Sequence, residues 1–132
     1  MGYQIIEKIN LNSSNVSIKV FAPLVALKAQ AGQFVIVRAA ADGERIPLTV
    51  ADFDREKGTV KIIFQIVGAT TYLLNRLNVG DCLADFVGPL GNPTETEGLK
   101  KVAVVGGGVG CAIAYPVAKK LHEEGAKVHS IV

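Results

Sequence analysis

The 132-residue chain has little cysteine, no large excess of either charge and no long apolar run, and each shortage excludes a class of protein. Its two cysteines, Cys82 and Cys111, form no Cys-x-x-Cys pair and have no histidine at ligand spacing, so we expect no metal site and a reducing, cytoplasmic compartment. The 14 basic and 12 acidic residues leave a net charge of +2, and the basic residues are scattered, which argues against a nucleic-acid surface. No stretch approaches the roughly 18 apolar residues that span a bilayer. Glu7 and Lys8 interrupt the N-terminus where a signal peptide would be apolar.

What is present is the composition of a soluble globular protein. Hydrophobic residues make up 49% of the chain and charged residues 20%, and both kinds recur along its whole length. The length suits one complete domain and part of a second. No Ser-His-Asp or paired-carboxylate arrangement is visible, so the sequence does not indicate acid–base hydrolysis.

The first part of the chain, residues 1–97, is predicted to be a six-stranded antiparallel β-barrel domain. Val16, Ile18 and Val20 alternate with polar residues, as in a strand with one face in the core and one in water. Segments rich in Val, Ile and Phe, separated by turn signals, occur at residues 3–11, 16–21, 34–39, 46–50, 59–67 and 82–87. Residues 70–77 carry leucines at helical spacing instead, which predicts one helix inserted into the barrel.

From residue 98 onward the pattern changes to the opening of an α/β domain. A short apolar run at 101–105 leads into a glycine-rich turn, and the following segment has Ile113, Val117 and Leu121 on one helical face. Gly125 lies where a C-terminal cap belongs, and a second strand begins at 127. Residues 98–132 are therefore expected to be the first β-α-β of a nucleotide-binding domain that is incomplete here, and the chain to be a fragment.

The glycine-rich turn, residues 106–110, is the sharpest motif in the chain. Glycines between a strand and a helix let the backbone approach a phosphate, and the helix N-terminus offers unpaired N–H groups. Cys111 stands at the sixth position of the G-x-G-x-x-G pattern, so the match is not complete. The alternative interpretation is a tight turn whose small residues serve helix–strand packing.

Two further segments contain candidate ligand contacts. The strand at 44–50 has Arg45, Pro47 and Thr49 on one face, and Gly68, Thr70 and Thr71 open the predicted helix, where N–H groups and hydroxyls suit a diphosphate. Taken singly, the threonines fit a plain N-cap as well as a ligand site, and Arg45 fits a solvated surface residue.

In this order the three segments resemble the ferredoxin-NADP reductase superfamily, and most closely its anaerobic branch of electron-transfer subunits. The branch motif R-x-P-[LI]-[ST] is matched by Arg45, Pro47, Leu48 and Thr49. The resemblance implies that the flavin ring of FAD packs on this strand, with Thr49 as the catalytic hydroxyl residue near the reactive N5. It implies further FAD contacts at Ile46, Phe64, Gln65, Ile66, Gly68, Thr70 and Thr71, and nucleotide contacts at Gly107, Gly108, Val109 and Gly110.

One departure from the superfamily concerns the arginine. Most members have R-x-Y-S, with the arginine three residues before the hydroxyl residue and a tyrosine on the flavin. Here Arg45 is four residues before Thr49 and no tyrosine is present, which leaves open whether Arg45 contacts the diphosphate.

The resemblance implies an FAD-containing electron-transfer subunit that passes electrons between NAD(P)H, FAD and an iron–sulfur partner. A [2Fe-2S] cluster is expected outside these residues, a second redox subunit is the expected partner, and the fragment alone is expected to be inactive. Such chemistry needs no acid–base pair from the protein, because the cofactor supplies it. Two alternatives remain open: a non-catalytic flavin-binding or assembly module, and part of a flavin-free NAD-dependent dehydrogenase.

Overall fold

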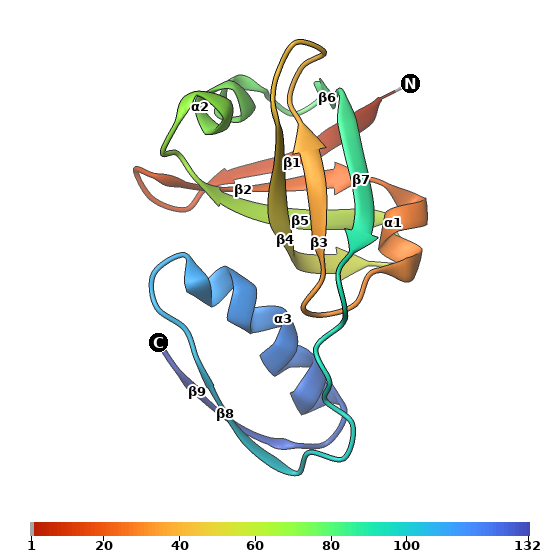
Figure 1. Ribbon diagram of the computed structural model, residues 1–132, viewed down its shortest axis with the longest axis vertical. Coiled ribbons are helices and arrows are strands. Elements are labelled where there is room, and N and C mark those ends of the chain that lie inside the picture. Colours follow the sequence, from red (N-terminus) through yellow and green to blue (C-terminus); the bar gives the residue numbers. More distant parts are fainter. Residues whose placement is uncertain (1) are drawn as a thin grey trace.

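A computed structural model describes residues 2–132, in which an antiparallel barrel is followed by a small α/β unit (Figure 1). The barrel is one sheet with the strand order β6-β1-β2-β5-β4-β3-β7. Its strands are β1 (Tyr3–Asn10), β2 (Asn15–Phe21), β3 (Phe34–Arg38), β4 (Arg45–Asp54), β5 (Thr59–Gln65), β6 (Cys82–Leu83) and β7 (Asp85–Leu90). Two helices, α1 (Pro23–Lys28) and α2 (Ala69–Arg76), lie between strands of the barrel.

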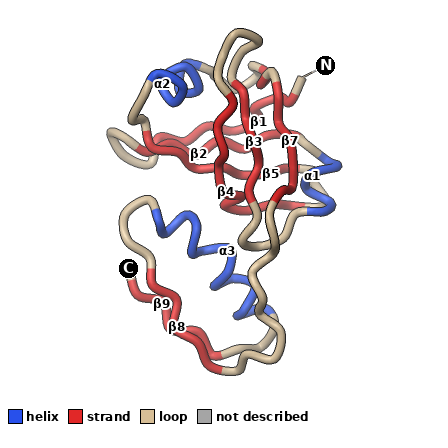
Figure 2. The backbone as a smooth tube through the Cα atoms, viewed as in Figure 1, coloured by secondary structure: helices blue, strands red, loops and turns tan. Residues whose placement is uncertain are grey.

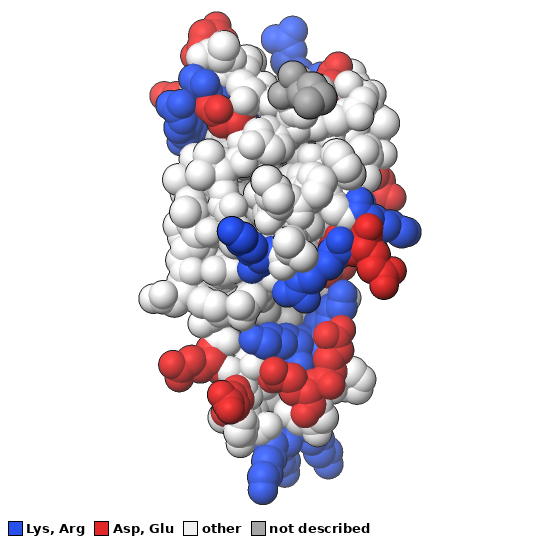
Figure 3. Space-filling model, turned by 90° about the vertical axis from the view of Figure 1, so that its right-hand side faces the viewer, with Lys and Arg blue, Asp and Glu red and all other residues white. Residues whose placement is uncertain are grey.

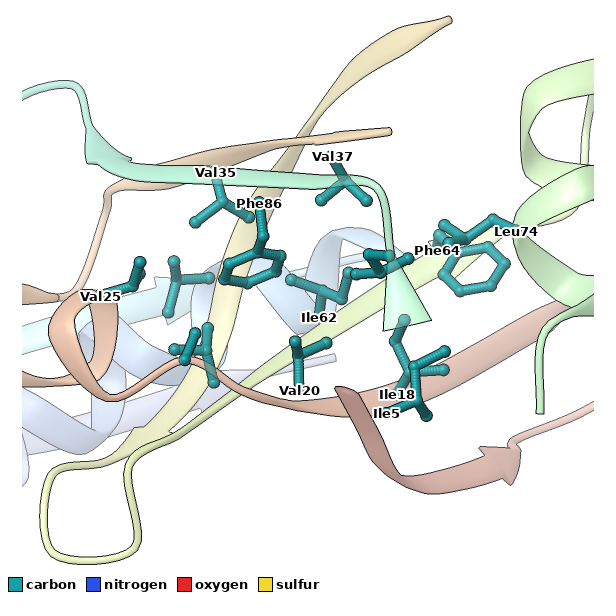
Figure 4. Close-up of a cluster of buried hydrophobic side chains, with 14 of the residues drawn as sticks. Ile5, Ile18, Val20, Val25, Val35, Val37, Ile62, Phe64, Leu74 and Phe86 are labelled. Carbon is teal, nitrogen blue, oxygen red and sulfur yellow. The ribbon is translucent and has the colours of Figure 1, made fainter. Parts of the chain in front are cut away.

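The barrel encloses a core built from alternate residues of its strands. On β2, Val16, Ile18 and Val20 are all at most 1% exposed, and they pair with Phe64, Ile62 and Val60 of β5. The alternation predicted from the sequence therefore directs these side chains inward. Figure 4 shows side chains from β1, β2, β3, β5, β7 and both helices meeting in this core.

The α/β unit consists of β8 (Lys101–Val105), α3 (Gly110–Glu123) and β9 (Lys127–Ile131). Strands β8 and β9 pair in parallel, and α3 lies between this pair and the barrel, where it packs against β4 (Figure 2). Residues 91–100 connect the two parts without a helix or strand. No helix among the described residues is long and apolar enough to cross a membrane.

The observed barrel has more elements than the sequence predicted. The segment at 82–87 divides into β6, which pairs with β1, and β7, which pairs with β3, so that the sheet has seven strands instead of six. At the junction the Ala84 N–H donates to the Arg38 carbonyl (2.9 Å), as the chain passes from one partner strand to the other. Helix α1 was also not predicted, because its six residues are too few to show a helical period.

Candidate functional site

The central feature of the site is a wedge between β4 and β5. Val50 is the first residue of β4 that pairs with β5, opposite Ile62; the preceding residues 45–49 pair with β3 alone. Residues 63–65 of β5 likewise pair with β2 alone. The two strands diverge here (Figure 1), so main-chain N–H and C=O groups on both inner edges have no strand partner. Such groups need a hydrogen-bonding partner from solvent or from a ligand.

The side chains of β4 alternate as the sequence predicted. Ile46 and Leu48 are half-buried and pack against the core, whereas Arg45 and Pro47 are exposed and Thr49 is half-buried on the opposite face. The proline ring and the threonine hydroxyl therefore lie on the outward face of the strand that borders the wedge.

The end of β5 offers fewer side chains to the wedge than the family resemblance implied. Phe64 is only 2% exposed and lies beside Leu74 in the core (Figure 4), so only its main chain is available to a ligand. Ile66 also packs against the core, and its N–H donates to the Ser14 carbonyl (2.7 Å). Gln65 is the one exposed side chain of the three.

The N-terminus of α2 follows directly and has the properties of an anion-binding helix end. The Thr71 hydroxyl accepts hydrogen bonds from the N–H groups of Val67 (2.9 Å) and Gly68 (3.0 Å), so Thr71 acts as the cap. A Cβ atom added to Gly68 would meet nothing within 4 Å, and the first turn holds no acidic residue. The N–H groups of that first turn remain without helical partners and carry the positive end of the helix dipole.

One contact joins this helix end to the start of β4. The Thr70 hydroxyl donates to a carboxylate oxygen of Glu44 (3.2 Å), the residue just before the strand. Arg45, by contrast, pairs with Asp85 of β7 (3.2 Å), and Asp85 also pairs with Arg38 of β3 (2.6 Å). The structure thus brings the β4 motif and the α2 N-terminus together, but it directs the Arg45 guanidinium toward Asp85.

The glycine-rich turn lies at the N-terminus of α3, and its glycines differ in what they require. A Cβ on Gly106 would approach the Cα of Cys111 at 3.1 Å, so this glycine serves strand–helix packing. Gly108 has φ +56°, which favours glycine for its conformation. Neither packing nor a left-handed backbone requires glycine at Gly107 or Gly110, where an added Cβ would meet nothing within 4 Å. Packing alone therefore does not account for the run of glycines.

Helix α3, which the turn precedes, is connected to the barrel by an ion pair that was not predicted from the sequence. The Lys119 Nζ of α3 lies 3.0 Å from Oδ1 of Asp52 on β4. The hydrogen bond that Lys119 donates to Asp52 raises the pKa of the lysine above the usual 10.5. Their separation of 67 positions leaves no local signal in the sequence. Beside the pair, a cleft of about 500 Å³ separates the first turns of α3 from the barrel and is lined by Ala51, Ile63, Val109 and Tyr115, among others.

Comparison with known proteins defines the family to which the chain belongs. Residues 4–94 match the family of oxidoreductase FAD-binding domains, and the chain belongs to this family. The predicted fold, an FAD-binding antiparallel barrel with an inserted helix followed by β-α-β, is confirmed.

Individual relatives show which members of this family are similar to the chain. The dihydroorotate dehydrogenase B (NAD(+)) electron transfer subunit homolog of Thermotoga maritima is 42% identical over 98% of this chain and 46% of its own length. An uncharacterized protein in the adh 3′ region of Clostridium beijerinckii is 49% identical over 98% of this chain and 46% of its own length. The solved structure of an NADH-dependent reduced ferredoxin-NADP oxidoreductase matches 98% of this chain and 47% of that chain, with 42% identity and a TM-score of 0.95. The chain thus spans about half the length of the curated relatives it matches.

Proposed function

We propose that this chain is the FAD-binding part, with the first β-α-β unit of the nucleotide-binding part, of an NAD(P)H-dependent electron-transfer subunit. The observation that carries the proposal is the wedge between β4 and β5, which opens beside the N-terminus of α2 in a chain of the FAD-binding family. A planar ring with polar edges suits two unpaired strand edges, and a diphosphate suits the adjoining helix end.

Within this proposal each segment has a distinct task. Main-chain groups of residues 45–49 would hold the flavin ring, and the Thr49 hydroxyl would lie against it. Gly68, Thr70 and the first-turn N–H groups of α2 would hold the FAD diphosphate, while Thr71 keeps the cap in place. When bound, FAD accepts two electrons from a reduced nicotinamide and releases them one at a time.

The glycine-rich turn would hold the diphosphate of NAD(P). Residues 107–109 have N–H groups with no main-chain partner among the described residues, and Gly107 and Gly110 leave open space for a ligand. Nucleotide sites in open α/β sheets are assembled from loops at the carboxyl ends of several parallel strands, and two such strands are described here. We therefore assign complete NAD(P)H oxidation to a longer form of the protein.

The partner we propose is a second redox subunit. The Thermotoga relative is named an electron transfer subunit homolog, which supports a role in passing electrons onward. We place the iron–sulfur group in that partner or in sequence beyond these 132 residues.

The test begins with reconstitution of the purified chain with an equimolar mixture of FAD and FMN, followed by mass spectrometry of the released cofactor. FAD alone is expected, because the α2 N-terminus provides a second anion site beside the ring. Release of FMN alone, or of no flavin, would contradict the assignment, and the latter result would favour a flavin-free dehydrogenase.

A second measurement mixes the FAD-loaded chain with NADH under anaerobic conditions and follows flavin absorbance. We expect no rapid bleaching, because orientation of the two reactants can account for about 7–11 kcal/mol of the barrier to hydride transfer, and the described residues supply only one nucleotide turn. Bleaching at a rate comparable to that of a longer form of the protein would contradict the assignment of complete NAD(P)H oxidation to the longer form. A longer form that binds FAD and is not reduced by either NADH or NADPH would instead indicate a non-catalytic flavin module.

A further inference from the structure

We propose that the Asp52–Lys119 ion pair is a positioning device that sets where the glycine-rich turn lies relative to the flavin strand β4. This role rests on the proposed function. The placement of the barrel relative to the α/β unit can nevertheless be tested without any cofactor.

The two partners belong to the elements that carry the two candidate sites. Asp52 follows Thr49 on β4, at an irregularity in its pairing with β5, and Lys119 lies on the helix that the glycine-rich turn opens. The Lys119 Nζ is 3.0 Å from Oδ1 of Asp52, and the same oxygen accepts the Phe53 N–H at 2.9 Å. This second bond holds the carboxylate in one orientation, so the lysine meets a fixed acceptor.

The ion pair lies where α3 packs against β4. It is the sole ion pair between the barrel and residues 98–132 among the residues that the structure describes. Asp52 borders a cleft of about 500 Å³ on one side and another of about 510 Å³ on the other, both between the barrel and α3. Ala51 of β4 and Pro116 of α3 are both buried. Figure 3 shows acidic and basic side chains both at the upper end of the molecule and over its lower half, with a largely uncharged band between them.

The distance along α3 relates the ion pair to the glycine-rich turn. Lys119 is nine residues from the start of α3, which corresponds to about 14 Å of helix. A displacement of α3 by about 1 Å at Lys119 would move the helix N-terminus, and with it the turn, by about the same distance, because a regular helix moves as a rigid rod. Misplacement of reacting groups by about 1 Å can reduce a rate about 100-fold.

The arrangement is also shared by a related protein. The TM-score of 0.95 to the NADH-dependent reduced ferredoxin-NADP oxidoreductase extends over 98% of this chain. An overlap of that extent requires both the barrel and the α/β unit to superpose together. Their mutual placement is therefore a reproducible property of the fold, which is what a positioning contact has to maintain.

The experiment measures residual dipolar couplings of the ¹⁵N-labelled, cofactor-free chain and fits separate alignment tensors to the barrel and to residues 101–131. One common tensor is expected for the wild type. Asp52→Asn and Lys119→Met, which remove charge at nearly constant size, should each cause loss of the common tensor. The double exchange Asp52→Lys with Lys119→Asp should restore it. Lys120→Met is the matched control, because Lys120 is the next residue and forms no ion pair with another described residue.

Either a common tensor in both single variants or no rescue by the exchange would overturn the proposal. Since both partners are partly exposed, with side-chain exposures of 31% for Asp52 and 39% for Lys119, the variants should fold, and amide chemical-shift dispersion checks this. FAD affinity, measured on the same variants, should be unchanged. Absence of FAD binding in every sample, wild type included, would overturn the proposed function and leave the tensor result standing.

Discussion

The substitution Gly68→Ala separates flavin binding from stability at the start of α2. The backbone at Gly68 is extended, with φ −160° and ψ −179°, a conformation open to any residue, and the added methyl group would meet no atom within 4 Å. Alanine is a poorer N-cap than glycine by about 0.5–1 kcal/mol. It also restricts the unfolded chain, which stabilises the fold by about 0.4–1 kcal/mol. The free energy of unfolding should therefore change by no more than about 0.5 kcal/mol.

FAD affinity should respond differently, because the methyl group would occupy the space that we assign to the diphosphate. A hydrogen bond to a charged group contributes about 1.5–3 kcal/mol, and the loss of one such bond corresponds to an affinity weakened about 10- to 150-fold. Urea denaturation measures the stability, and quenching of flavin fluorescence on binding measures the dissociation constant. Gly107→Ala, a change at another open glycine, serves as the control and should leave both quantities unchanged. An unaltered FAD dissociation constant in Gly68→Ala would show that the diphosphate does not lie at this helix end.

Three further outcomes follow from the same structure. Thr49→Val should leave the free energy of unfolding, measured by urea denaturation, within about 0.5–1 kcal/mol of the wild type and should shift the flavin reduction potential; an identical potential and reduction rate would show that Thr49 does not contact the ring. Gly106→Ala should lower the free energy of unfolding, measured in urea, by about 1–3 kcal/mol, because the new Cβ would lie 3.1 Å from the Cα of Cys111, whereas Gly107→Ala should lower it hardly at all; equal losses would refute the distinction. The Asp54 carboxylate accepts N–H groups of the β4–β5 turn, which holds its pKa below 3.8, so its stabilisation should be present above about pH 4 and disappear as the pH falls further. Thermal unfolding of Asp54→Asn at pH 7 and pH 3 checks this: the difference from wild type should shrink at pH 3.

Local patterns sufficed to predict most of the elements. The alternation of Val16, Ile18 and Val20 predicts a strand because a half-buried strand directs every second side chain inward, whatever its partner. The helical spacing in residues 70–77 and the glycine-rich turn before α3 are likewise local, since caps and turns are decided by neighbouring residues. The division of 82–87 into two strands was not predictable in this way, because it depends on which strands flank the segment once the barrel closes.

The placement of the candidate site residues could be predicted only in part, for the same reason. The motif from Arg45 to Thr49 identified the strand, and the structure confirms its alternation. Phe64 carries an apolar side chain near the predicted site, but the path of β5 through the barrel directs it into the core. The guanidinium of Arg45 pairs with Asp85, forty positions further along the chain, because β3 brings β4 and β7 to its two edges.

The sequence by itself determined features that depend on a few consecutive residues: the faces of the strands, the capped start of α2 and the glycine-rich turn between β8 and α3. Tertiary structure alone decided the wedge between β4 and β5, the contact of Glu44 with Thr70, and the pairing of Asp52 with Lys119. The physical reason is distance along the chain. Contacts of this kind form only after the sheet has curled and the helices have packed on it, so no short window of sequence contains both partners.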